Sequence, residues 1–160
     1  MTIYAFVASH RIIDLTTVAL LSNGASSVPE TLTSDTAGQL GVEGSVVLAT
    51  CNRLEVYIKL AVPEHLAPVS ELIFAHIAAQ AGLAQEIVSS SFEVYSDLES
   101  AEHLFTVASG LESAVVGERE IAGQVRRALA TAQQAGPVPG ELVQLFEHAA
   151  HTARQVGQHT

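Results

Sequence analysis

The single cysteine of the chain, Cys51, is the side chain best suited to covalent chemistry. It directly follows a short apolar run over residues 45–50, and Arg53 stands two positions further on. We expect a tight turn here to expose the sulfur, and a nearby guanidinium to favour the thiolate, which is the nucleophilic form of cysteine. The alternative is a small buried hydrophobe, which free cysteines commonly are. Position alone leaves both interpretations open.

The seven histidines are weaker candidates for chemistry. His148 and His151 stand three positions apart in an expected helix and could bind zinc, but no further ligand stands at a convincing spacing. A surface pair is the better interpretation, so we expect no metal site. His103 stands among apolar residues, which is typical of a half-buried histidine with a satisfied hydrogen bond. His10 directly follows the first expected strand, where it either faces a cleft or is solvated.

A second group of polar residues stands in the C-terminal half: Ser113, Glu118, Glu120 and Gln124. Glu120 and Gln124 are four positions apart and share a helix face, and Glu118 stands at the helix start, where the dipole favours a carboxylate. The alternative interpretation is helix capping and a solvated face. The nearby glycines form no dinucleotide fingerprint, because no strand leads into a G-x-G-x-x-G turn. We therefore expect no dinucleotide cofactor to bind this chain.

The elements that must position these residues follow from the periodicity of apolar side chains. Strands are predicted over residues 3–8, 45–50, 53–60 and 92–95, and helices over 16–21, 31–40, 63–83, 98–109, 119–135 and 139–160. Residues 53–60 alternate cleanly between apolar and polar, and the short join at Cys51 and Asn52 predicts an antiparallel hairpin. The β-α-β-β-α-β order predicts an α+β fold: a ferredoxin-like antiparallel sheet with helices on one face, followed by C-terminal helices. We expect Cys51 at the edge of a cleft formed with the helices after Leu98.

Composition limits the classes of function. The chain has 160 residues, 48% of them hydrophobic, and a formal net charge of -10. That charge argues against a classical nucleic-acid domain, but not against one that touches only the end of an RNA. A lone cysteine excludes a disulfide framework and a cysteine-rich zinc site, and fits a reducing compartment. The N-terminus predicts no signal peptide and no apolar run predicts a membrane span, so we expect a soluble cytoplasmic protein.

Three stretches together carry a family resemblance: VLATCNRLEVY at 47–57, HLFTVASGLES at 103–113, and GE at 117–118 followed by GQV at 123–125. They resemble the N-terminal half of glutamyl-tRNA reductase, the enzyme that opens the five-carbon route to tetrapyrroles. The likeness covers essentially the whole chain, and the T-C-N-R-x-E-x-Y motif followed by S-G-L-x-S and G-E is highly specific. The chain ends inside a helical pattern, which predicts a fragment of a longer protein; the alternative is a natural terminal helix.

The resemblance implies a catalytic domain over residues 1–160, with a ferredoxin-like core over about 1–97 and a helical extension over 98–160. Cys51 would attack the ester that joins glutamate to the tRNA 3′ end and form a thioester. NADPH, bound on a domain absent from this chain, would then reduce the thioester to glutamate-1-semialdehyde. This chain alone is expected to lack the reductase step and to bind no NADPH. The implied partner is the aminoacyl end of glutamyl-tRNA, and the full-length enzyme would be a homodimer through absent C-terminal parts.

The resemblance also implies roles for single residues. His103 matches a histidine that is important for activity, and the positions that hold the glutamyl substrate match Thr50, Asn52, Arg53, Ser113, Glu118, Glu120 and Gln124. These types suit the chemistry, because an ester carbonyl needs an activated nucleophile and donors for its oxyanion. The α-amino group needs an acceptor such as Glu118, and the side-chain carboxylate a forked donor such as Arg53.

Three departures from the family's pattern are visible. After Ser9-His10 the chain reads RIID in place of a Thr-Ala-Pro-like segment, Glu120 replaces a glutamine, and VGQHT replaces V-R-x-x-T at residues 156–160. The first bears on the role of His10 and the second on substrate affinity. Two rival interpretations remain: a non-catalytic glutamyl-tRNA-binding or regulatory module of the same fold, and a structural fragment that serves as a partner surface. The intact T-C-N-R run favours the enzyme.

Overall fold

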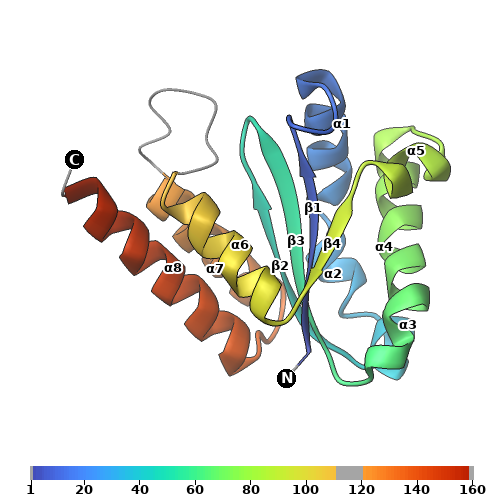
Figure 1. The fold of residues 1–160 in the computed structure, drawn as a ribbon. Coiled ribbons are helices and arrows are strands. Elements are labelled where there is room, and N and C mark those ends of the chain that lie inside the picture. The colour runs from blue at the N-terminus through green and yellow to red at the C-terminus, as the bar shows by residue number, and fades with distance from the viewer. Residues whose placement is uncertain (1, 111–120, 159–160) are drawn as a thin grey trace.

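One four-stranded antiparallel sheet organises the molecule (Figure 1). The computed structural model describes residues 2–110 and 121–158, with side chains described through residue 152. The strands are β1 (Ile3–Ser9), β2 (Val42–Ala49), β3 (Arg53–Leu60) and β4 (Glu93–Ser96), in the spatial order β2-β3-β1-β4. Every neighbouring pair is antiparallel. The predicted antiparallel sheet and the hairpin at Cys51 are confirmed. The assignment of the fold to the ferredoxin-like class stays a prediction.

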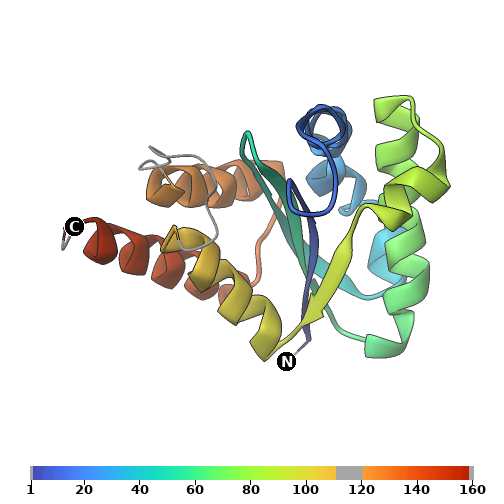
Figure 2. The ribbon, with the colours of Figure 1, turned by 45° about the horizontal axis from the view of Figure 1, so that its top comes forward.

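Helices cover both faces of the sheet, as Figure 2 shows. One face packs against α1 (Leu15–Ala25), α2 (Val28–Thr31), α3 (Asp35–Gln39), α4 (Leu66–Ala81) and α5 (Gln85–Ser90), with the short 3-10 turn η1 (Pro63–His65) leading into α4. The other face packs against α6 (Leu98–Ala108), α7 (Ile121–Ala135) and α8 (Gly140–Gln158). None of these helices, within the part of the chain described, is long and apolar enough to cross a membrane.

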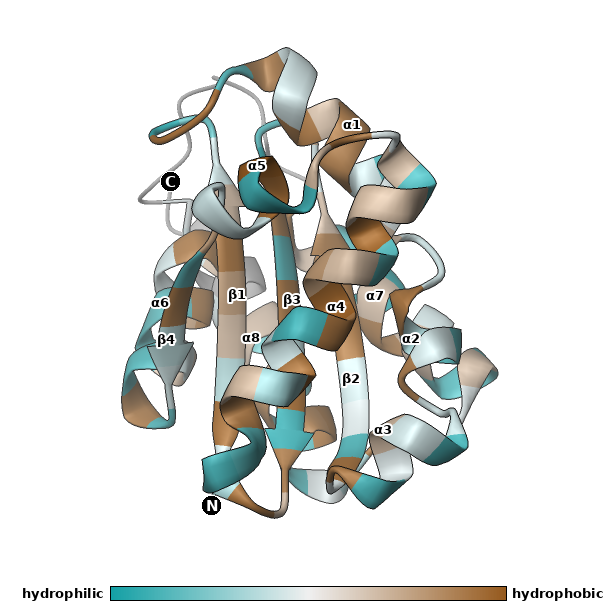
Figure 3. Ribbon diagram, turned by 90° about the vertical axis from the view of Figure 1, so that its right-hand side faces the viewer, coloured by the Kyte–Doolittle hydropathy of each residue, from teal (hydrophilic) through white to brown (hydrophobic). Residues whose placement is uncertain are grey.

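The helices of the predicted β-α-β-β-α-β unit, α1–α5, lie on one face of the sheet as expected, and the C-terminal helices α6–α8 cover the other face. The reason lies in β1, whose seven residues are all buried. Ile3, Ala5 and Val7 belong to the core under α6–α8, whereas Tyr4, Phe6 and Ala8 belong to the core under α1–α5. Figure 3 shows the hydrophobic colour along this strand. A sheet that is apolar on both faces must be covered on both, because each exposed face would leave apolar surface in water.

Two further differences concern helices. The single helix predicted over residues 31–40 is two short helices, because Ser34 begins a new one by accepting a hydrogen bond from the Ala37 amide at 3.3 Å. Helix α5 was not predicted. It follows the end of α4 at Gly82, whose positive φ of 70° is the left-handed conformation that commonly terminates a helix.

Candidate active site

The turn that joins β2 to β3 presents Cys51 to solvent. The Thr50 amide donates to the Arg53 carbonyl at 2.9 Å, and the Asn52 amide donates to the Thr50 hydroxyl oxygen at 3.2 Å. Cys51 is exposed, while Asn52 and Arg53 on its C-terminal side are each 2% exposed. The expectation that this turn exposes the sulfur is confirmed, and the interpretation of Cys51 as a buried hydrophobe is wrong.

The end of β1 supports the same turn. Ser9 pairs with Arg53 in the sheet register, and the His10 amide donates to the Asn52 carbonyl at 3.0 Å. The Nδ1 atom of His10 is buried and makes no hydrogen bond with any described residue. A buried polar atom without a partner is rare in folded proteins, and a catalytic role is one of the explanations for it. His10 therefore lies beside the candidate site with a ring nitrogen that no described residue engages.

Behind the turn lies a buried ionic cluster centred on Glu55. Its Oε2 atom contacts the Arg53 Nη1 atom at 3.2 Å and the His103 Nε2 atom at 2.8 Å, and its Oε1 atom accepts a hydrogen bond from the Tyr57 hydroxyl at 2.7 Å. The Glu55 side chain is fully buried, and those of Arg53 and His103 are 2% and 8% exposed. The His103 ring stacks on Tyr95 of β4, with ring centroids 4.9 Å apart. One carboxylate thus joins β3 to α6.

The electrostatics of this cluster keep Glu55 ionised. Burial raises the pKa of Glu55, but the hydrogen bond and charge of His103, the charge of Arg53 and the Tyr57 hydroxyl outweigh burial and lower that pKa below its ordinary value. A charged group without water must find compensation in its neighbours, and here three side chains provide it. The charge of Glu55 therefore depends on its contacts with His103, Arg53 and Tyr57.

The structure brings several sequence-predicted site residues together. Thr50, Asn52 and Arg53 share the turn with Cys51, and His103 reaches Arg53 through the carboxylate they share. The Nη1 atom of Arg53 donates to Glu55, so part of the guanidinium that was expected to clamp a substrate is engaged inside the protein. Three other predicted residues, Ser113, Glu118 and Glu120, lie outside the described residues.

Sequence reasoning missed Glu55 as a central residue. Alternation placed it on the polar face of β3, and the T-C-N-R-x-E-x-Y motif contains it, but neither shows that this face is buried. The signal that could have found it is a carboxylate with basic neighbours in a strand shielded on both faces. Among the described residues, no group of three His, Cys, Asp or Glu side chains is placed to hold a metal ion.

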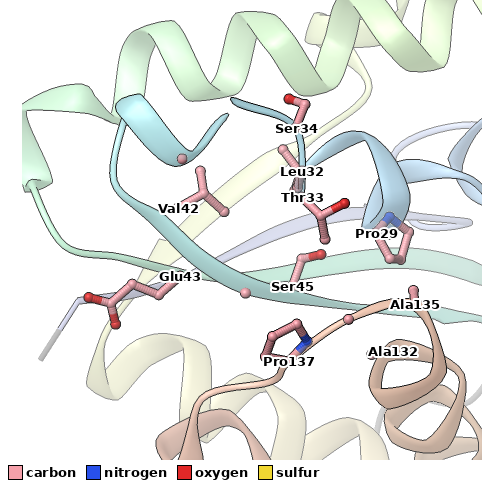
Figure 4. A pocket seen from close by; sticks show the side chains of 13 residues that line it. Pro29, Leu32, Thr33, Ser34, Val42, Glu43, Ser45, Ala132, Ala135 and Pro137 are labelled. Atoms are coloured by element: carbon pink, nitrogen blue, oxygen red, sulfur yellow. The ribbon is translucent and has the colours of Figure 1, made fainter. Parts of the chain in front are cut away.

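Two cavities follow the outer edge of β2. The first, of about 250 Å³, includes Ala49, two residues before Cys51, and Gln124 of α7, although Cys51 itself does not line it. The Oε1 atom of Gln124 is buried and has no hydrogen-bond partner in the described part of the chain. The second, of about 210 Å³, lies further along β2 between the α2–α3 segment and the end of α7 (Figure 4). The cavities share Pro29 and Ala132, so they are neighbours along one edge.

Comparisons with known proteins agree on one family. A family model described as "Glutamyl-tRNAGlu reductase, N-terminal domain" matches residues 7–160. The chain is 51% identical over 164 residues to the glutamyl-tRNA reductase of Kocuria rhizophila and 49% identical over 160 residues to that of Pseudarthrobacter chlorophenolicus, with 100% of this chain and 36% of each relative covered. A solved structure, glutamyl-tRNA reductase from Methanopyrus kandleri, matches with a TM-score of 0.71 and 27% identity, over 99% of this chain and 35% of that one. The chain therefore spans about a third of these relatives.

Proposed function

The chain belongs to the glutamyl-tRNA reductase family, as its N-terminal domain, and on that premise we propose that it is the catalytic domain in which Cys51 attacks glutamyl-tRNA. The observation that carries the proposal is the exposed sulfur of Cys51 in a turn whose next two residues, Asn52 and Arg53, are buried, with Arg53 anchored by Glu55. A nucleophile must be accessible, whereas the groups that aim it must be rigid. The exposed thiol favours this function over a module that only binds tRNA.

In the proposed reaction, the Cys51 thiolate forms a bond to the ester carbonyl carbon of the glutamyl group. The bond from that carbon to the terminal ribose oxygen breaks, and the oxygen takes up a proton as tRNA leaves. The glutamyl group stays on Cys51 as a thioester. Thr50, Asn52 and Arg53, which lie around the turn, are proposed to hold the substrate, together with Ser113, Glu118, Glu120 and Gln124. His103 is proposed to support catalysis through its contact with Glu55.

Reduction of this thioester to glutamate-1-semialdehyde would need a hydride, which NADPH would supply in the whole enzyme. The residues of this chain do not suit that cofactor. No described strand leads into a helix through a G-x-G-x-x-G turn, and the acidic composition offers few cations for its phosphates. NADPH is therefore proposed to bind another part of the parent protein, and this chain alone is proposed to stop at the thioester.

The proposal also covers the fold of the core, the location and partner of the enzyme, and its oligomeric state. The strand order β2-β3-β1-β4 supports a ferredoxin-like core over about residues 1–97, with α6–α8 as the extension over 98–160. The family resemblance supports a cytoplasmic enzyme with glutamyl-tRNA as its partner. It also supports a homodimer formed through parts outside this chain.

The proposal is tested by following the release of glutamate from charged tRNA. The wild-type chain should deacylate glutamyl-tRNA, and Cys51→Ala should not, because the substituted turn has no nucleophile. Circular dichroism of both proteins should agree, since an exposed turn side chain contributes little to packing. A short glutamyl ester run in parallel removes the need for tRNA docking. Equal release by the Cys51→Ala protein would refute the assignment, and NADPH consumption by this chain would refute the absence of a cofactor site.

A further inference from the structure

The cavity at the Cys51 end of β2 lies between the outer edge of that strand and helix α7. It is lined by Ser26, Pro29, Val47, Ala49, Gln124, Arg127, Ala128, Thr131 and Ala132. We propose that this cavity binds the phosphodiester that precedes the 3′-terminal nucleoside of the tRNA, with Arg127 as the charged contact. The proposal rests on the function proposed above, and it leaves Gln124 with the glutamyl group.

The position of the cavity suits the tRNA side of the ester that Cys51 attacks. Ala49 lines the cavity, and two residues of extended chain, from Ala49 to Cys51, span at most about 7 Å. Along α7, Gln124 and Arg127 line the cavity about one helical turn apart. In the substrate, one ribose separates the ester from the phosphate. A glutamyl group held by Gln124 and a phosphate held by Arg127 are therefore neighbours in the protein as they are in the substrate.

Arg127 supplies the charge that a phosphate needs. It is exposed, it lines the cavity, and it makes no ion pair or hydrogen bond with the side chain of another described residue. Arg53 and Lys59, in contrast, are paired with carboxylates. Because the formal net charge of the chain is -10, its overall field repels RNA, and a cation without a carboxylate partner is where the RNA backbone can be held.

Neutral donors lie in the same cavity as Arg127. β2 is an edge strand, and its Thr50 amide donates to the Arg53 carbonyl at 2.9 Å. Since hydrogen-bonded pairs alternate along antiparallel strands, the amide of Ala49 points away from β3, towards the cavity that Ala49 lines. The exposed residue Thr131 adds a hydroxyl on the α7 wall. Guanidinium, backbone N–H and hydroxyl groups are the donors with which proteins bind nucleic-acid phosphates.

The size of the cavity suits a phosphate and not a whole nucleotide. Its volume of about 250 Å³ lies below the range of about 300–1,000 Å³ typical of sites for drug-sized ligands. Pro29, Val47 and Ala128 give the rest of the lining apolar surface, against which a ribose can pack. The bases are therefore expected to lie outside the cavity, and a phosphate contact carries no sequence information.

The test compares two acyl donors that differ in one charge. Both are glutamyl esters of a dinucleotide, one with the natural phosphodiester and one with a neutral methylphosphonate in its place. The rate of Cys51 acylation is read from the intact mass of the protein at donor concentrations below saturation. We expect the phosphodiester to react about tenfold faster with the wild-type chain, near the low end of what a bond to a charged group contributes, because Arg127 is exposed. The logarithm of this preference should fall with the logarithm of salt concentration, with a slope of about 0.7 for one contact to a single strand.

Two adjacent arginines locate the contact. Arg127→Gln should bring the ratio of the two rates close to one. Arg126→Gln is the matched control, because it removes the same charge at an exposed position that lines a different cavity, between α7 and α8, and it should keep the wild-type ratio. Thr131→Val should lower the ratio by less than Arg127→Gln does, because it removes a hydroxyl and leaves the charge in place.

The outcomes separate this inference from the function on which it rests. Equal acylation of the wild-type chain by the two donors would overturn the phosphate site and leave Cys51 as the nucleophile. A preference that survives Arg127→Gln, or one that Arg126→Gln abolishes equally, would overturn the location of the site. No acylation by either donor would overturn the proposed function, and this inference with it.

Discussion

Two ionic clusters lie on the same face of β3, one at each end of the strand. At the Cys51 end, Glu55 contacts Arg53 and His103, and all three side chains are 8% exposed or less. At the other end, Lys59 pairs with Glu43 at 2.9 Å and with Glu141, and these side chains are between 20% and 41% exposed. The alternation of β3 places Arg53, Glu55 and Lys59 on one face of the strand, but the surroundings of its two ends differ.

The difference shows where charge has structural consequences. An exposed ion pair exchanges contacts with water and contributes little to stability. A buried one has lost its water, so removing one partner leaves an uncompensated charge. Only the buried cluster stands behind the candidate nucleophile, with His103 of α6 and the stacked Tyr95 shielding it. We interpret the buried cluster as the support that fixes the turn, and the exposed one as a surface contact between β2, β3 and α8.

The largest effect is expected from Glu55→Gln. This change keeps the shape of the side chain but leaves the Arg53 guanidinium buried without its counter-charge, so stability should fall by about 3–5 kcal/mol. Urea unfolding measures the loss, and acylation of Cys51 should fall with it. Glu43→Gln is the matched control on the exposed cluster and should shift the unfolding midpoint far less. Equal shifts in the two variants would remove the distinction between the clusters.

Lowering the pH should reduce the stability that the buried cluster provides through Glu55. The pKa of Glu55 is lowered in the folded protein, so protonation is easier in the unfolded chain. Its contribution to stability is therefore complete above the ordinary glutamate pKa of about 4.3 and is lost as pH falls through the lowered value. Urea unfolding between about pH 6 and about pH 3 should show a steeper loss for the wild type than for Glu55→Gln. Parallel curves would contradict a role for this carboxylate.

A smaller effect is expected from Arg53→Lys, which keeps the charge but removes the planar fork. The loss of a charge-assisted bond costs about 1.5–3 kcal/mol, so the catalytic efficiency of acylation should fall about ten- to hundredfold. Arg53 is buried beside Glu55, so the ion pair between them is not a surface contact. If the lysine variant is acylated with wild-type efficiency, the role of Arg53 is limited to balancing the charge of Glu55.

The smallest effect is expected from Lys59→Met. Glu141 and Glu43 raise the pKa of Lys59 through hydrogen bonds, but the ammonium remains solvated, so its loss should scarcely change stability or acylation. Whatever small shift is measured should disappear at about 1 M salt, where charges are screened within about 3 Å. A large, salt-resistant loss would show that this end of β3 is also structurally essential.

Local patterns predicted much of the fold and part of the site. Alternation over residues 53–60 matched the bounds of β3, and the short join at Cys51 predicted both the hairpin and the exposed sulfur. The placement of α6–α8 on the second face of the sheet was not predicted, because the two apolar faces of β1 interleave in one continuous run. The contact of Glu55 with His103 was also missed, since it joins residues 48 positions apart and depends on how α6 packs. The roles of Ser113, Glu118 and Glu120 stay predictions.

The location of the glutamyl group after reaction tests the central claim most directly. The wild-type chain is mixed with glutamyl-tRNA or with a short glutamyl ester, quenched in acid, digested and analysed by mass spectrometry. We predict a glutamyl adduct on the peptide that contains Cys51, no adduct in Cys51→Ala, and no oxidation of NADPH added in parallel. An unmodified Cys51 peptide with both substrates, or an adduct on a different residue, would contradict the account.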